Sequence, residues 1–183
     1  MKLERYFLKP GELMITEVPT TVTTVLGSCV AITMFSERCS VGGICHAMLP
    51  QGSSAQPTEK FRYVDTSILH MAQLFETLGV KKSEIETKVL GGADVLDRAN
   101  GSSASVGEQN IVAALKTIKR AGLTIVASDL GGDLGRKVIF YTHKGLVLVK
   151  RIDRRKVEVP DRTSTKAPAL LDAVAKGLPS AIP

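Results

Sequence analysis

The chain has 183 residues, of which 44% are hydrophobic and 4% aromatic, with a formal net charge of +6 at pH 7. This length suits one core that needs neither disulfides nor structural metals, and aliphatic side chains must supply most of its packing. No apolar run approaches the roughly 20 residues that span a bilayer, and no signal-peptide pattern follows the charged start, so we expect a cytoplasmic protein without membrane insertion.

The first third of the chain predicts short strands joined by polar turns. Alternating apolar residues after a Pro-Gly turn indicate an outer strand over residues 12–18. Two apolar runs rich in β-branched residues, 23–32 and 41–50, predict the next strands. The polar segment 36–40 between them is short enough for an antiparallel hairpin.

Two later segments have helical spacing. The first begins at an N-cap, Asp65, and ends at Gly79, and the second runs from about Glu108 to Gly122. Their apolar residues recur at intervals of three and four, so each helix packs one face on a sheet. These residues are Ile68, Met71, Ala72, Phe75 and Leu78 in the first helix, and Ile111, Leu115 and Ile118 in the second.

The remaining apolar runs predict strands over 86–90, 123–128, 137–141 and 146–150, the last two forming a hairpin. Several strands with two helices exclude an all-α protein and predict an α/β or α+β fold. We expect one domain over residues 1–159, followed by a proline-containing tail over 160–183 that holds a short helix candidate or stays without structure.

Cys29 and His46 are reactive side chains set among residues that would otherwise be pure core. A thiol attacks carbon only as thiolate, so a catalytic cysteine needs a nearby base, and histidine is suited to that role. Gly27 and Ser28 lie where the chain must turn tightly, and such a turn can aim backbone N–H groups at a developing oxyanion. Taken alone, each reactive residue is more often structural: a free cysteine is commonly a small buried hydrophobe.

Other chemistries fit the residues less well. No pair of cysteines has the spacing of a zinc site, and the Gly-Gly motifs lack the lysine and serine of a phosphate-binding loop. The positive charge favours an acidic partner, and charge alone does not separate nucleic acid from an acidic protein. The basic segment 150–156 carries no aromatic residues on which bases would stack, so we expect no nucleic-acid role there. Three cysteines, an odd number, agree with a reducing compartment.

The reactive residues belong to a larger set of motifs. These are Thr23-x5-Cys29 within Leu26-Gly27-Ser28-Cys29, Gly43-x2-His46-x2-Leu49-Pro50, Gly91-Gly92-Ala93, Gly107-x2-Asn110 and Asp129-x-Gly131-Gly132. Together they closely resemble the CheD family of chemoreceptor glutamine deamidases, over most of the chain up to about Arg151. The resemblance implies a central β-sandwich-like mixed sheet with helices packed on the outside.

The resemblance also implies an activity and its residues. The protein would be a cysteine-dependent hydrolase that converts glutamines of methyl-accepting chemotaxis receptors to glutamates through a thioester, without a cofactor or metal. Cys29 would be the nucleophile, His46 the base and Thr23 the residue that orients the imidazole, although Thr21, Thr24 and Ser28 lie close by. Gly27 and Ser28 are candidates for substrate or oxyanion contacts.

A second role follows from the same resemblance. The protein would act as a non-catalytic adaptor that binds and stimulates a CheC-type phosphatase of the chemotaxis response regulator. An enzyme of this kind requires Cys29, whereas an adaptor tolerates its replacement. A thiol enzyme of another type, such as a transamidase or protease, would also require Cys29 but give another product.

Overall fold

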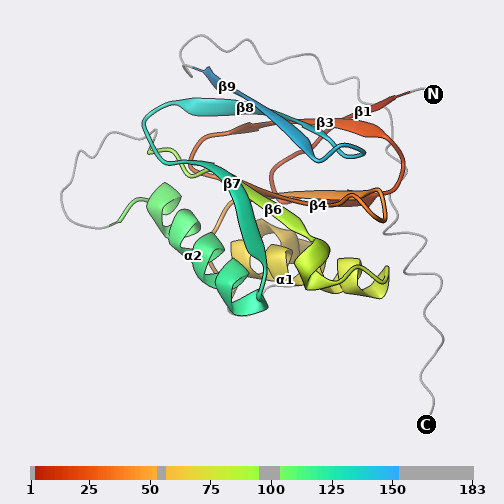
Figure 1. Ribbon diagram of the computed structural model, residues 1–183. Coiled ribbons are helices and arrows are strands. Elements are labelled where there is room, and N and C mark those ends of the chain that lie inside the picture. The colour runs from red at the N-terminus through yellow and green to blue at the C-terminus, as the bar shows by residue number, and fades with distance from the viewer. Residues whose placement is uncertain (1–2, 53–56, 95–103, 153–183) are drawn as a thin grey trace.

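Two β-sheets stack face to face, and two helices cover the outer face of one of them (Figure 1). The computed structural model describes residues 3–52, 57–94 and 104–152. The mixed strands and helices confirm the expected α+β fold with a sandwich-like centre. The tail predicted over 160–183 lies outside the described residues.

The first sheet has four strands in the order β1-β3-β8-β9. Their bounds are Glu4–Phe7 for β1, Thr20–Leu26 for β3, Gly135–Tyr141 for β8 and Leu146–Ile152 for β9. The predicted hairpin of the last two strands is confirmed, and β8 also pairs antiparallel with β3. Strand β1, parallel to β3, was not predicted.

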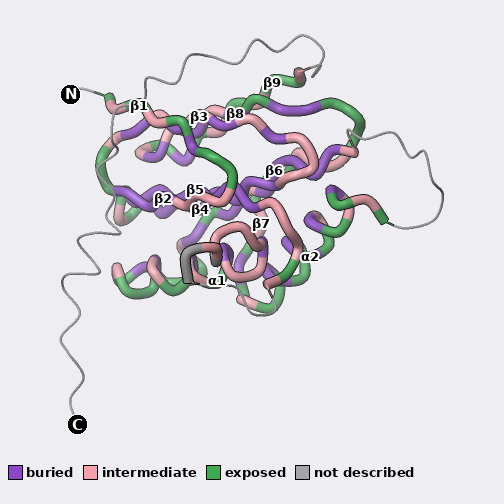
Figure 2. Tube along the Cα trace, turned by 180° about the vertical axis from the view of Figure 1, so that it is seen from behind, coloured by how far each residue is buried: buried purple, intermediate pink, exposed green. Residues whose placement is uncertain are grey.

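The second sheet has five strands in the order β2-β5-β4-β6-β7. Their bounds are Leu13–Thr16 for β2, Val41–Ala47 for β5, Val30–Ser36 for β4, Glu86–Gly91 for β6 and Thr124–Leu130 for β7. The predicted antiparallel hairpin of β4 and β5 is confirmed, and every residue of both strands is buried. Figure 2 shows this buried layer between the other sheet and the helices.

Helices α1 (Val64–Thr77) and α2 (Val106–Ala121) pack on the second sheet, with the short 3₁₀ turns η1 (Pro57–Arg62) and η2 (Lys82–Glu84) before and after α1. Both helix starts were predicted too late. Tyr63 takes the N-cap position of α1 in place of Asp65, and Ser105 caps α2 through a hydrogen bond with Glu108. Leu115, predicted to face the sheet, is 40% exposed.

The apolar core has two layers separated by the second sheet. The helices and the sheet face beneath them form the larger cluster, and the two sheets enclose a smaller one. The chain crosses between the sheets at Gly27–Cys29, so the run 23–32 supplies the end of β3 and the start of β4 rather than one strand. Neither described helix is long and apolar enough to cross a membrane.

Candidate active site

His46 lies near the end of β5 and points between the two sheets. Its neighbour Cys45 takes the opposite face of the strand and packs in the helix-side cluster. The His46 side chain is buried, with 1% of the residue exposed, and its backbone is fixed by hydrogen bonds from Gly11 N and to Glu12 O of 2.8 and 2.9 Å. The backbone of His46 is therefore fixed at this end of β5, and its imidazole is enclosed in the sandwich.

The hydroxyl of Thr24, from the facing sheet, determines the tautomer of this imidazole. Thr24 Oγ1 lies 2.8 Å from the Leu8 carbonyl oxygen and 2.8 Å from His46 Nδ1. A carbonyl only accepts, so the single hydroxyl proton goes to Leu8, and Oγ1 must accept from Nδ1–H. This assignment leaves the lone pair of His46 on Nε2.

The protein environment keeps the imidazole neutral. Burial lowers the pKa of His46 from 6.5 to about 4, and a hydrogen bond with the Leu8 backbone opposes this shift in part. His46 Nε2 is buried and has no hydrogen-bond partner among the described residues. A neutral ring with an unoccupied basic nitrogen is suited to accept a proton from a neighbouring acid.

Cys29 stands at the same end of the β4–β5 pair as His46. The ladder pairs Val30 with Ala47 and Ala31 with His46, and Cys29 directly precedes the first of these pairs. Its half-buried side chain packs against the cluster between the sheets, the layer that His46 enters. The structure thus places the two residues that the sequence singled out at one end of the same strand pair.

Thr23 is not placed as predicted. Its neighbour Thr24 faces the inside of the sandwich with Val22 and Leu26, so the alternation of β3 directs Thr23 to the outer face. The sequence correctly separated the faces of these threonines, but the hydrogen bond with His46 is made by Thr24 and not by Thr23, which the family resemblance favoured. The aliphatic residues at Val22 and Leu26 were the available signal, since they mark the buried face of β3.

The turn that carries Cys29 is pinned through its carbonyl groups. Gly27 O accepts from Ala93 N at 2.9 Å, and Cys29 O accepts from Gly92 N at 2.8 Å. Gly91 makes this approach possible: its φ of +105° suits glycine, and a Cβ there would overlap the Cys29 carbonyl oxygen. The bond to Gly27 O fixes the peptide plane between the predicted site residues Gly27 and Ser28, and with it the direction of the Ser28 N–H.

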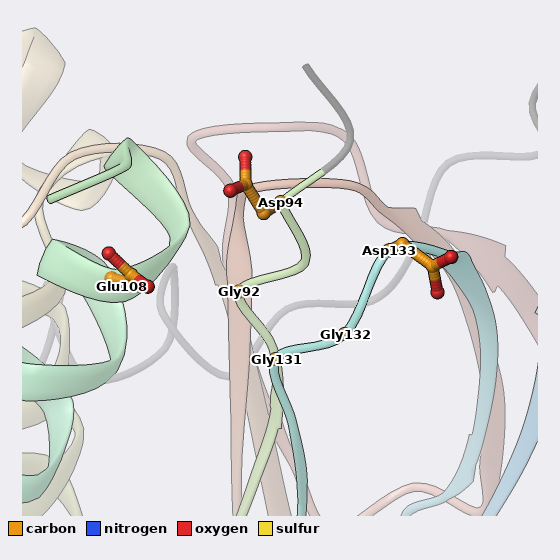
Figure 3. A pocket seen from close by; sticks show the side chains of 6 residues that line it. All are labelled: Gly92, Asp94, Glu108, Gly131, Gly132 and Asp133. Atoms are coloured by element: carbon orange, nitrogen blue, oxygen red, sulfur yellow. The ribbon is translucent and has the colours of Figure 1, made fainter. Parts of the chain in front are cut away.

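A pocket of about 410 Å³ opens where the loops after β6 and β7 lie near the start of α2 (Figure 3). Its lining residues are Gly92, Asp94, Glu108, Gly131, Gly132 and Asp133. The carboxylates come from the loop after β6, the start of α2 and the loop after β7, and neither Cys29 nor His46 lines the pocket. Within the described ranges, no group of three or more histidine, cysteine or acidic residues is arranged to hold a metal ion.

An ion pair holds the loop after β7, which contributes Gly131 to this pocket. The fully buried Arg136 donates to Asp129 Oδ1 at 2.9 and 3.0 Å and to Gly131 O at 2.6 Å. Gly131 N in turn donates to Gly91 O. The glycine motifs are thus one hydrogen-bonded stack that leads to the Cys29 turn.

Comparison with known proteins gives consistent matches. The family model described as CheD chemotactic sensory transduction matches residues 48–151. A Geobacter sulfurreducens protein named "Probable chemoreceptor glutamine deamidase CheD 2" is 43% identical over 157 residues, which cover 86% of this chain and 96% of that protein. A Maridesulfovibrio salexigens protein named "Probable chemoreceptor glutamine deamidase CheD" is 40% identical, with coverages of 83% and 94%.

Among solved structures, the chain is similar to YlmD from Geobacillus stearothermophilus. The two share 13% sequence identity at a TM-score of 0.45, and the match covers 70% of this chain and 59% of that one.

Proposed function

This chain belongs to the CheD family, and we propose that it is a chemoreceptor glutamine deamidase in which Cys29 is the nucleophile and His46 the base. One observation carries the assignment of the residues: a buried, neutral His46 presents an unoccupied Nε2 at the end of the strand pair where Cys29 lies. The family membership supports the substrate, since the curated relatives are named for glutamines of chemoreceptors.

The first half of the reaction forms a thioester. His46 Nε2 takes the proton of the Cys29 thiol, and the sulfur adds to the side-chain amide carbon of a receptor glutamine. The imidazolium then gives this proton to the departing nitrogen, so that ammonia leaves and a glutamyl thioester remains. Because burial disfavours the charged ring, His46 returns this proton readily.

The second half releases the product. Water gives a proton to the same Nε2 and adds to the thioester carbon, and collapse of the adduct returns the proton to Cys29 sulfur and frees the receptor glutamate. The oxyanion of both steps is stabilised by backbone N–H groups of the Gly27–Cys29 turn. The hydrogen bonds to Gly27 O and Ser28 O support this assignment, because the same two peptide planes carry the N–H groups of Ser28 and Cys29.

The substrate is presented by the receptor's cytoplasmic part, and we place the enzyme in the cytoplasm. None of the three cysteines, all within the described residues, forms a disulfide, as expected in a reducing compartment. The net charge of +6 would favour association with an acidic protein surface.

To test the proposal, the purified protein is incubated with a cytoplasmic receptor fragment. Peptide mass spectrometry then measures the conversion of receptor glutamines to glutamates. Replacing Cys29 or His46 by alanine should abolish conversion, whereas Cys39→Ser, a cysteine substitution in the β4–β5 turn, should preserve it. Unchanged receptor with folded wild-type protein, or conversion that survives Cys29→Ala, would refute the proposal.

The alternative is an adaptor that binds a CheC-type phosphatase and stimulates it. Binding and stimulation that persist in the Cys29→Ala protein, while the wild type leaves the receptor unchanged, would support that role. If the wild type converts the receptor and binds the phosphatase, and Cys29→Ala loses only the conversion, one protein holds both functions.

A further inference from the structure

Asn110 is a buried polar residue of α2 that touches both halves of the candidate active site. Its side-chain Nδ2 donates to Ser28 O at 2.9 Å and to Met48 O at 3.0 Å, and the residue is fully buried. Ser28 directly precedes Cys29, and Met48 follows His46 by two residues. One amide nitrogen therefore links the residue before Cys29, just ahead of β4, to the segment that follows His46 at the end of β5.

These two hydrogen bonds lie just beyond the end of the β4–β5 ladder. The β4–β5 pairing ends at Val30 and Ala47, and beyond this point the strands no longer hold each other by ladder bonds. Asn110 bridges the two chains one step further on, where the ends would otherwise separate. A separation there would change the distance between Cys29 and His46 directly.

The chemistry of the site fixes the orientation of the amide. Both neighbours of Nδ2 are carbonyl oxygens, so exchanging the amide nitrogen and oxygen would set three acceptors against one another. Asn110 Oδ1 is buried and has no hydrogen-bond partner among the described residues. Burying such an oxygen costs stability, so packing alone would favour an apolar side chain here.

We propose that Asn110 is a positioning residue that sets the alignment of Cys29 with His46 by clamping the Ser28 and Met48 carbonyls. The inference rests on the proposed function, because it assigns Asn110 its role through that pair. Asn110 does not touch the substrate in this scheme, so it affects the chemical step rather than binding.

Three variants separate clamping from packing. Asn110→Leu keeps similar volume without donors, and Asn110→Asp keeps the shape but turns a carboxylate oxygen toward two carbonyls. Thr117→Val is the matched control, a buried polar position two turns further along the same helix. If Asn110 acts as a clamp, kcat should fall from the wild type to Asn110→Leu and fall further in Asn110→Asp. If Asn110 only fills space, the isosteric Asn110→Asp should be the milder change.

The measurement is kcat and KM for receptor conversion, with folding verified by circular dichroism. We expect Asn110→Leu to lower kcat by about tenfold or more with KM nearly unchanged, since small misplacements of reacting groups have such effects. Thr117→Val should keep wild-type kcat. Wild-type kcat in folded Asn110→Leu would overturn the inference, and this holds even where Asn110→Asp fails to fold.

A second measurement needs no receptor. In a Cys39→Ser background, the rate of Cys29 alkylation by iodoacetamide should fall in both Asn110 variants and stay unchanged in Thr117→Val. If wild-type protein fails to convert the receptor, the proposed function fails, yet slowed alkylation would still support the clamp. Equal alkylation in all four proteins would overturn it.

Discussion

The hydroxyl of Thr24 connects the two sheets at the candidate active site, and its role can be tested against that of its neighbour. Thr24→Val removes the acceptor for His46 Nδ1–H and the donor to Leu8 O. We expect kcat to fall by about tenfold or more, because the imidazole loses its fixed tautomer, and stability to fall by about 1–3 kcal/mol.

Thr23→Val is the matched control, since it makes the same change one residue earlier on the outer face. It should keep nearly all activity and stability. Steady-state kinetics and urea unfolding of both variants check this. Loss of activity in Thr23→Val alone would instead restore the orienting role that the family resemblance implies for Thr23.

The three cysteines differ in environment, and this predicts their reactivity. Burial raises the pKa of Cys45 to about 12, although hydrogen bonds with the Ile32 backbone and Ser67 act in the opposite direction. Cys45 therefore remains a protonated thiol at neutral pH and should resist alkylation. Mass spectrometry after brief treatment with iodoacetamide should find Cys29 modified and Cys45 intact, and Cys45 should react only in denaturant. Labelling of Cys45 in folded protein would contradict its placement.

At the scale of elements, the end of β6 is shaped by its contact with the nucleophile turn. Gly91→Ala imposes a positive φ on alanine and drives a Cβ into the Cys29 carbonyl oxygen. We expect a loss of more than about 2 kcal/mol in unfolding free energy and a loss of deamidation, because the turn must move.

Gly79→Ala supplies the comparison for this variant. Gly79 also has a positive φ, +76°, but a Cβ there would meet nothing within 4 Å. Gly79→Ala should lower the free energy of unfolding only by the cost of placing alanine at a positive φ, about 1–2 kcal/mol, and should retain activity. Chemical denaturation of both proteins measures the difference, and equal stabilities would show that the contact with Cys29 does not matter.

At the scale of the whole molecule, periodicity was enough to predict the helices, because each buries one face against the sheet. The β4–β5 hairpin was predicted from two continuous apolar runs, and both strands are buried throughout. Strand β1 was missed since Glu4–Phe7 has only four residues, alternates between half-buried and exposed, and has its partner some 16 residues ahead in β3. The stacking of two sheets came from the family resemblance, because alternation within a strand does not identify which sheet covers it.

The candidate site was predicted only in part for a related reason. Cys29 and His46 were identifiable as reactive residues within apolar runs, and the structure places them at one end of a strand pair. The contacts of Thr24 and Asn110 depend on packing between separate elements, over 22 residues to His46 and 82 residues to Ser28. No local sequence pattern indicates contacts between residues so far apart along the chain.

The burial of His46 also makes the stability of the whole fold depend on pH. Its pKa is about 4 in the folded protein and 6.5 in the unfolded chain, so the unfolded state binds the proton first as the pH falls. The contribution of neutral His46 to the free energy of unfolding is complete above pH 6.5. It is lost as the pH falls from 6.5 to 4, by about 3 kcal/mol in total, at about 1.4 kcal/mol for each pH unit. Urea unfolding at pH 7 and pH 4 should show this loss in the wild type and a smaller one in His46→Gln, which cannot titrate there. Because acidic residues lower stability equally in both proteins, only the difference between them reports on His46, and identical pH dependence would mean that the folded state accepts a charged imidazole.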